Sequence, residues 1–223
     1  MDWTPISLTL KLASITTVVL LIISIPLGKW LAFTSSRIKP FMETLVSMPL
    51  VLPPTVLGFY LLLAFSPDSQ LGQILEQWFG LRLAFSFPGL VIASVIYSLP
   101  FMVHPIQSGL TSLSPSLLDA SKVMGKSYLT TLFRVELPNI KPSLLTGIVL
   151  SFAHTIGEFG VVLMIGGSIP DRTRVASIAI YDEVEALNYG TAHQYSLILL
   201  TLAFLVLLLV YLVNGGYLKR FWQ

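Results

Sequence analysis

Residues 8–33 read LTLKLASITTVVLLIISIPLGKWLAF, and Lys11 and Lys29 are the only charged residues among them. About 20 predominantly apolar residues are enough for a helix to cross the hydrocarbon core of a bilayer. The stretch is too long for the apolar part of a cleaved signal peptide, and Asp2 stands where such a peptide carries positive charge. We therefore predict that residues 8–33 are a retained first membrane span.

Two features of this span predict its shape. We expect Lys11 and Lys29, near its two ends, to extend their ammonium groups toward the membrane interface. Pro26 and Gly28 predict a kink before the span ends, because proline removes a hydrogen bond from the helical backbone.

The composition of the whole chain indicates the same class of protein. Hydrophobic residues make up 54% and charged residues 11% of the 223 residues, whereas soluble domains carry about 25% charged residues. Four further apolar blocks follow the first, at residues 41–65, 85–106, 144–165 and 195–213. We predict an all-α integral membrane protein with five transmembrane helices. The sequence has no internal repeat and no linker, so residues 1–223 are predicted to form a single domain.

The second block contains three prolines, Pro49, Pro53 and Pro54. Proline cannot supply the N–H that a helical hydrogen bond needs, and a membrane tolerates the freed carbonyl groups only where protein or water satisfies them. We therefore expect this span to be broken and to face protein rather than lipid.

Basic residues gather on one side of the predicted spans. That side holds Arg37, Lys39, Lys122, Lys126, Arg134, Lys141, Lys219 and Arg220. The other side holds only Arg82, Arg172 and Arg174, diluted by acidic residues. Lysine and arginine are enriched in cytoplasmic loops, so we predict that the N-terminus lies outside and the C-terminus lies in the cytoplasm.

Residues 114–138, on the predicted cytoplasmic side, have the pattern of two short helices joined by a glycine. Ser114 precedes a proline and suits the N-cap of the first helix, and Gly125 suits the left-handed residue that ends it. A second helix is predicted from Ser127, and Pro138 stops it. This helix-turn-helix is too small to be an enzyme and suits a docking element.

The same loop resembles the one that defines the permease subunits of binding-protein-dependent ABC importers. It reads Asp119-Ala120-Ser121, three residues, Gly125, nine residues, and then Val135-Glu136-Leu137-Pro138. The family pattern has Glu-Ala-Ala, Gly and Ile-x-Leu-Pro at the same spacing, so Asp119, Ser121 and Val135 are departures. In that family the loop docks into a groove of the ATPase subunit and transmits its closure to the spans. The resemblance implies an ATPase-coupling role for Leu117, Asp119, Ala120, Ser121, Gly125, Val135, Leu137 and Pro138.

Other stretches resemble the molybdate permeases of this family. Residues 49–58 read PLVLPPTVLG, with a Pro-Pro pair that sulfate permeases tend to lack, whereas Gly157-Glu158-Phe159-Gly160 is shared with sulfate permeases. The resemblance implies a permease subunit that moves molybdate and is not itself an enzyme, because a separate ATPase hydrolyses ATP. A tungstate or sulfate/thiosulfate permease is the alternative within the class. An ion-coupled secondary transporter, with Glu158 as a proton carrier, is the alternative from another class.

Small and polar residues recur at helical spacing along the fourth predicted span: Gly147, Ser151, Thr155 and Glu158. One interpretation is that this face, together with Pro53 and Pro54, lines the translocation path or its gate at a dimer axis. The other is close helix packing through small residues, with Glu158 capping a partner helix. A carboxylate is a poor ligand for an anion, so we do not expect Glu158 to bind substrate.

No pattern in the chain predicts a metal site or a catalytic residue. His154 and Glu158 lie four residues apart, but two ligands do not make a site and no further ligand is apparent in that span. Ser151 and His154 lie three apart on one helix, a spacing that rarely gives a nucleophile and its base the required geometry. The chain has no cysteine, which excludes thiolate chemistry and Cys-based metal sites.

Arg172 and Arg174 lie in the predicted external loop and have two interpretations. They help to receive an oxyanion or dock an acidic binding protein, or they belong to a solvated loop held by Asp171 and Glu183. The predicted spans contain no cluster of basic residues that would grip a dianion, which fits a permease whose selectivity resides in a separate binding protein.

These interpretations predict the partners of the chain. We expect a homodimer in the bacterial cytoplasmic (inner) membrane, surrounded by lipid, with the substrate path along the two-fold axis. Each copy would dock one subunit of an ATPase dimer that binds ATP and Mg²⁺, and an extracytoplasmic binding protein would deliver molybdate. We expect no cofactor on this chain and no nucleic-acid partner.

Overall fold

The structure is a computed structural model that describes residues 1–214 of the chain. Every regular element among these residues is a helix, which confirms the all-α prediction. The elements are α1 (Thr4–Phe33), α2 (Lys39–Val51), α3 (Pro54–Phe65), α4 (Gln70–Phe79), α5 (Phe87–Thr111), α6 (Pro115–Val123), α7 (Tyr128–Thr131), the π-helix η1 (Leu132–Glu136), α8 (Leu137–Asn139), α9 (Lys141–Gly157), α10 (Gly160–Gly166), α11 (Ala176–Glu185) and α12 (Tyr189–Asn214). Lys219, Arg220 and the predicted cytoplasmic C-terminus lie outside the described residues.

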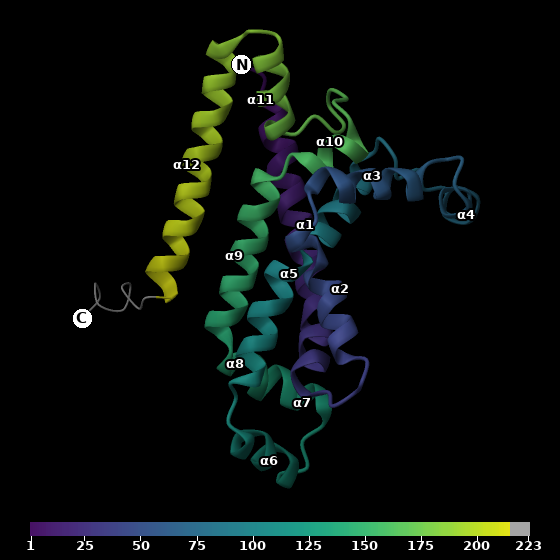
Figure 1. Ribbon diagram of the computed structural model, residues 1–223. Helices are drawn as coiled ribbons and strands as arrows, with labels where there is room; N and C mark the ends of the chain where they lie inside the picture. The colour runs from purple at the N-terminus through teal and green to yellow at the C-terminus, as the bar shows by residue number, and fades with distance from the viewer. Residues whose placement is uncertain (215–223) are drawn as a thin grey trace.

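Long helices form the body of the molecule (Figure 1). α1 packs against α5 and α9, and α12 packs against α9 and α11. The N-terminus and α11 lie at one end of this body, and α6 lies at the other. α1, α5 and α12 are each long and apolar enough to cross a membrane, and two bent helix pairs bring the number of spans to five if each pair counts as one. The predicted five spans thus include two that are not straight.

The second span is broken, as its prolines predict. The helix direction bends by 113° between α2 and α3, and Leu52 and Pro53 lie between the two helices. The expectation that this span is covered by protein is not met within the chain, because Val51 is 85% exposed and Tyr60 is 63% exposed. Whatever covers this apolar surface comes from outside the described chain.

The fourth span is also broken, at Glu158 and Phe159. The helix direction bends there by 60° between α9 and α10. α10 packs against α3, and a Cβ placed on Gly160 would lie 2.8 Å from Cβ of Pro54. The breaks of the second and fourth spans therefore lie against each other, which no single stretch of sequence could indicate.

α1 is one continuous helix through Pro26, so this proline does not break the first span. Gly28 instead allows close packing. A Cβ placed on Gly28 would lie 2.9 Å from Cγ2 of Ile106, so α1 and α5 can approach here only because this residue has no side chain. Buried side chains of both helices, including Leu20 and Met102, continue the contact.

The two lysines of the first span behave differently from each other. The Lys11 ammonium lies 4.9 Å from the centroid of the Phe87 ring, and Lys11 is exposed. Lys29 is only 8% exposed and binds Glu136, so the prediction that it extends to the membrane interface is wrong. The residues near Lys29 in the sequence do not include Glu136, whose carboxylate holds the lysine in the interior.

Candidate functional site

The first half of the predicted coupling loop is α6, which projects from the end of the molecule (Figure 1). Ser114 has the extended backbone of an N-cap, and Pro115 begins the helix, as predicted. The Ser114 hydroxyl does not cap the helix, however, because it shares a hydrogen bond of 2.6 Å with the Ser116 hydroxyl. The start of α6 is therefore set by backbone geometry and by proline rather than by a side-chain cap.

Gly125 ends α6 in the left-handed conformation that its position predicts. Its φ angle is +63°, and its N–H donates to the carbonyl of Lys122 at 2.9 Å while the N–H of Lys126 donates to the carbonyl of Ser121 at 3.2 Å. These two bonds define a Schellman motif, which satisfies carbonyl groups at a helix end. No heavy atom lies within 4 Å of a Cβ placed on Gly125, so the requirement for glycine is conformational rather than spatial.

The second half of the loop differs from the regular helix that was predicted. Ser127 caps α7 by accepting a hydrogen bond of 3.2 Å from the Thr130 N–H, but the helix changes at Leu132 into the π-helix η1. Pro138 lies inside the short α8 rather than ending the segment. Proline has no N–H to donate to the carbonyl of Arg134, so the α-helical hydrogen-bond pattern lacks that bond here.

The predicted coupling residues occupy different environments. Ser121 is buried and its hydroxyl lies 2.7 Å from the Thr131 hydroxyl, which joins α6 to α7. Asp119 forms an exposed ion pair of 3.3 Å with Lys122. Leu117, Val135 and Leu137 are half-buried, and Ala120, Gly125 and Pro138 are exposed.

An exposed apolar patch covers the surface of this loop and was not among the predicted coupling residues. It consists of Val123, Met124, Leu129 and Phe133, which are between 61% and 88% exposed. Isolated exposed apolar residues are common, but several on one small projecting element mark a surface made for contact. Their helical spacing in the sequence was the signal that could have identified them.

At the break of the fourth span, Glu158 is the C-cap of α9 and is 4% exposed. Neither of its carboxylate oxygens has a hydrogen-bond partner among the described residues. Its backbone carbonyl accepts a hydrogen bond of 2.6 Å from the Ser177 hydroxyl of α11. The Ser94 hydroxyl of α5 is likewise buried without a hydrogen-bond partner among the described residues. Within the described chain, Glu158 therefore does not cap a partner helix.

The other residues of the predicted polar face lie in the interior of the chain. Gly147 allows close packing, since a Cβ placed on it would lie 3.0 Å from Sδ of Met102. The Thr155 hydroxyl donates to the Ser151 carbonyl at 2.8 Å, and the Ser151 hydroxyl has no partner among the described residues. This face thus combines close helix packing, at Gly147, with buried polar groups nearer the break.

His154 packs against α5. Its Nδ1 lies 2.9 Å from the Ser98 hydroxyl, and its ring stacks on Phe101 with centroids 4.1 Å apart. Among residues 1–214, no three His, Cys, Asp or Glu side chains are grouped so that they could hold a metal ion. The histidine is accounted for by packing and by one hydrogen bond.

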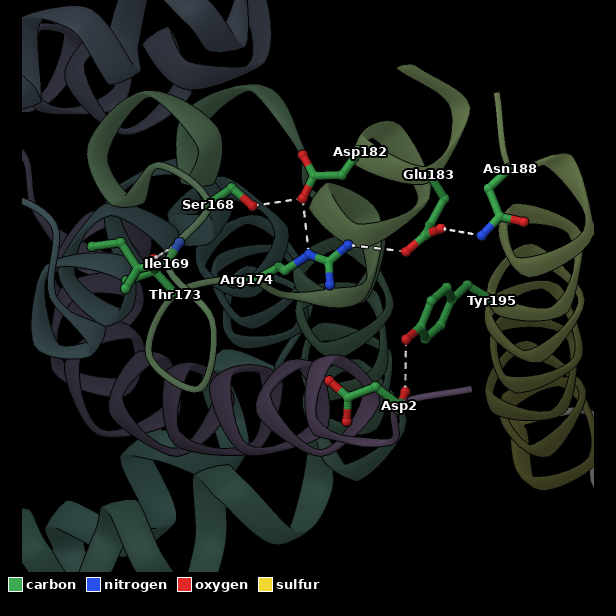
Figure 2. A network of polar contacts seen from close by, with 9 residues as sticks. All are labelled: Asp2, Ser168, Ile169, Thr173, Arg174, Asp182, Glu183, Asn188 and Tyr195. Carbon is green, nitrogen blue, oxygen red and sulfur yellow. Dashed lines mark hydrogen bonds and ion pairs between the residues drawn. The ribbon is translucent and has the colours of Figure 1, made fainter. Parts of the chain in front are cut away.

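At the opposite end of the molecule, Arg174 joins the loop before α11 to that helix (Figure 2). Its Nε lies 2.8 Å from Asp182 and its second guanidinium nitrogen lies 3.2 Å from Glu183. Burial lowers the pKa of Arg174, but the hydrogen bonds that its guanidinium donates to Asp182 and Glu183 raise the pKa more, and the net shift is upward. The prediction that Glu183 holds this loop is confirmed, while the second acid is Asp182 rather than Asp171.

Arg172 has different surroundings. It is exposed and has no ion-pair partner among the described residues. With Lys11, Ser86 and Asp171 it lines a pocket of about 300 Å³. Of the two predicted docking arginines, the structure therefore leaves Arg172 available for an outside ligand and uses Arg174 within the fold.

Apolar spans with two breaks that meet, and a projecting apolar docking element at one end, define a multi-pass helical membrane transport subunit. The chain belongs to the family of binding-protein-dependent transport system inner membrane components, whose pattern matches residues 24–220. It is accordingly a multi-pass inner-membrane transport subunit and not itself an enzyme.

Curated relatives cover nearly the whole chain. A molybdenum transport system permease protein of Azotobacter vinelandii is 47% identical over 94% of this chain and 93% of that protein. A putative molybdenum transport system permease protein of Bacillus subtilis is 34% identical over 93% of this chain and 92% of that protein. A probable sulfate transport system permease protein of Zygnema circumcarinatum is 35% identical over 82% of this chain and 62% of that protein.

Solved structures share the fold at low identity. A chain of a bacterial ABC transporter that imports alginate gives a TM-score of 0.77 at 16% identity, over 95% of this chain and 78% of that chain. A chain of the MetNI methionine ABC transporter in an inward-facing conformation gives 0.73 at 15% identity, over 97% and 99%. These likenesses place the broken spans and the projecting loop in the ABC transporter permease fold.

Proposed function

We propose that this chain is the membrane permease of an ABC importer for molybdate. The observation that carries the substrate is the 47% identity, over 94% of the chain, to a molybdenum transport permease. The observation that supports the mechanism is the exposed apolar patch of the coupling loop, because it offers a partner subunit a surface on which to dock. The Pro53-Pro54 pair at the break of the second span supports the same substrate class.

The coupling loop is the contact with the ATPase. Val123, Met124, Leu129 and Phe133 supply apolar surface that a groove of the ATPase subunit would bury. ATP and Mg²⁺ would bind on that partner and not on this chain. Closure of the ATPase dimer would draw two such loops together, one from each copy of the permease.

A second copy of the chain covers the broken second span. α2 and α3 expose Phe41, Val51, Phe59, Tyr60 and Leu63. Their bend of 113° leaves irregular backbone at membrane depth, which is tolerated where protein or a wet cavity surrounds it. A homodimer with these surfaces inward would place the two breaks near the two-fold axis, where an oxyanion would pass.

The end of the molecule with the N-terminus is the receiving face. Arg172 and Lys11 give the pocket of about 300 Å³ two cationic groups against one acid, Asp171. Such a pocket would attract an oxyanion, or an acidic side chain of the binding protein that delivers it, through long-range electrostatics. This arrangement agrees with an N-terminus outside and the coupling loop in the cytoplasm.

Sulfate is the second candidate substrate. A probable sulfate permease is 35% identical over 82% of the chain, and molybdate and sulfate are both tetrahedral dianions. Tungstate is nearly isosteric with molybdate, so the chain does not separate those two.

Uptake of labelled molybdate by cells with and without the gene tests the substrate, with tungstate and sulfate as competitors. We expect high-affinity uptake to disappear with the gene, tungstate to compete, and excess sulfate not to compete. Unchanged uptake in the deletion strain, or equal competition by sulfate, would refute the molybdate assignment.

A further inference from the structure

A buried ion pair joins the coupling loop to the first membrane helix. Lys29, near the end of α1, has its Nζ 2.8 Å from one carboxylate oxygen of Glu136 and 2.9 Å from the other. Only the second contact has hydrogen-bond geometry. The two side chains are 10% and 4% exposed, and the same ammonium lies 3.7 Å from the centroid of the Tyr128 ring. One lysine thus contacts two elements of the coupling loop, α7 and η1.

Stability alone does not explain this pair. Removing two charges from water costs several kcal/mol for each ion, and their attraction roughly compensates, so a well-packed apolar pair is often as stable or more so. What a buried pair does provide is a single arrangement of the elements that carry it, because either charge without the other is strongly disfavoured. Lys29 and Glu136 therefore fix α1 and η1 to each other in one register.

On the loop side, the connection runs from the exposed surface to Glu136 without interruption. The hydrogen bond between the Ser121 and Thr131 hydroxyls, 2.7 Å long, joins α6 to α7. α7 continues directly into η1, whose last residue is Glu136, and α6 also packs on η1. A force applied to α6 is therefore passed to the Glu136 carboxylate through bonded backbone and one hydrogen bond.

On the membrane side, the connection continues along α1. This helix has 30 residues and is about 45 Å long at 1.5 Å per residue. Gly28, beside Lys29, is packed tightly on Ile106 of α5. At the far end of α1, the Thr9 hydroxyl accepts a hydrogen bond of 2.8 Å from the Ala176 N–H at the start of α11.

The geometry points to Lys29 and Glu136 as positioning residues that transmit displacement of the coupling loop to α1, and through α1 to the receiving face. This inference rests on the proposed function, since it requires that an ATPase moves α6. It adds the route of transmission, which is the Lys29–Glu136 pair together with the Tyr128 ring.

The test measures molybdate transported per ATP hydrolysed, in proteoliposomes that hold the chain, its ATPase subunit and its binding protein. The key variant is Lys29→Met with Glu136→Leu, which removes both charges together and leaves no unpaired buried ion. We expect this variant to assemble with the ATPase and hydrolyse ATP, while the transport-to-hydrolysis ratio falls about tenfold, the scale of a coupling between distant sites. The charge-reversed pair, Lys29→Glu with Glu136→Lys, should recover part of the ratio, and Glu136→Asp should retain most of it.

The matched control neutralises the more exposed pair of Arg82 and Glu76, in and just after α4, and it should leave the ratio unchanged. A normal ratio in Lys29→Met with Glu136→Leu would overturn the inference. Failure of all three variants to assemble with the ATPase would overturn it too, because the pair would then serve folding alone. If the unaltered chain itself does not bind the ATPase, the proposed function fails instead.

Discussion

Arg172 and Arg174 are two residues apart, yet their surroundings indicate different roles. Arg174 is held between Asp182 and Glu183 (Figure 2), whereas Arg172 faces a pocket together with Lys11. From the sequence, both arginines could be predicted as docking residues, but their different roles could not be distinguished. The partners of Arg174 lie on α11, 8 and 9 positions further along the chain.

Replacing each arginine by methionine should separate the two roles. Arg174→Met leaves two partly buried carboxylates without their cation, so we expect it to lower thermal stability, by about 1–3 kcal/mol for loss of charged hydrogen bonds. Arg172→Met should leave stability unchanged and lower uptake at limiting substrate, since it removes attraction rather than structure. Thermal unfolding of the purified transporter measures the effect on stability, and initial uptake rates measure the effect on transport. Equal effects of the two variants on stability would contradict this division.

Gly125 is the residue whose conformation was predicted most fully from sequence, since both its place at the end of α6 and its left-handed backbone are confirmed. Gly125→Asn should be tolerated, because asparagine adopts this conformation more readily than other residues, whereas Gly125→Val should cost about 1–2 kcal/mol in local strain. Gly125→Trp adds bulk at the docking surface, where open space surrounds the glycine. We expect the Trp variant to reach the membrane but to lose ATPase co-purification and ATP-driven uptake. Normal uptake by that variant would contradict docking at this loop.

Lys29 shows why other parts of the site could not be predicted. A lysine near the end of a span normally extends to the interface, and its actual partner, Glu136, lies 107 positions away. Local patterns give the backbone preference of a residue, as at Gly125, but they do not give the partner of a charge.

Among the helices, the main feature is the contact between the two broken spans, where α10 packs on α3. Prolines predicted the break between α2 and α3, but the break after α9 lies at Gly157-Glu158-Phe159 and has no proline to signal it. The contact between the breaks depends on Gly160, whose missing side chain leaves room for Pro54. Spans and their order could be predicted from apolar length; their bends and contacts could not, because these depend on packing between distant segments.

Gly160→Val tests whether this contact holds the two breaks together. A Cβ at this position would lie 2.8 Å from Cβ of Pro54, and overpacking of this kind costs about 1–3 kcal/mol. We expect lower stability and reduced transport. Gly190→Val in α12 is the control, because no heavy atom lies within 4 Å of a Cβ at that position. Thermal unfolding of both purified variants decides, and equal midpoints would contradict the role given to Gly160.

The exposed apolar patch on the coupling loop predicts how a substitution there changes binding of the ATPase subunit. Met124→Asp places a charge in the surface that the ATPase would bury, and we expect it to weaken binding of the ATPase subunit by tenfold or more, about the loss seen for central interface residues. Tyr189→Ser, a change at an equally exposed aromatic residue of α12, should leave ATPase binding unaffected. Titration of the detergent-solubilised permease with the purified ATPase subunit measures both. Wild-type affinity in Met124→Asp would place the docking surface elsewhere.

At the scale of the whole molecule, the large apolar surface of α2 and α3 indicates that one copy is incomplete. Val51→Ser with Tyr60→Ser should shift the purified transporter from dimer toward monomer, because both side chains lie on the surface assigned to the second copy. Val18→Ser with Ile22→Ser, on the exposed face of α1, should keep the dimer. Native mass spectrometry distinguishes these outcomes, and a stable dimer in the first variant would contradict the assignment of this surface.

We propose that ATP, acting on the coupling loop through a partner subunit, drives an oxyanion through this chain. The most direct test is molybdate uptake into proteoliposomes that contain the chain, the ATPase subunit and the binding protein, with ATP or an ion gradient as the only energy source. We predict uptake with ATP and Mg²⁺ on the side of the coupling loop, and none with a proton or sodium gradient alone. Uptake that depends on the ion gradient and not on ATP would contradict ATP-driven import and favour a secondary transporter.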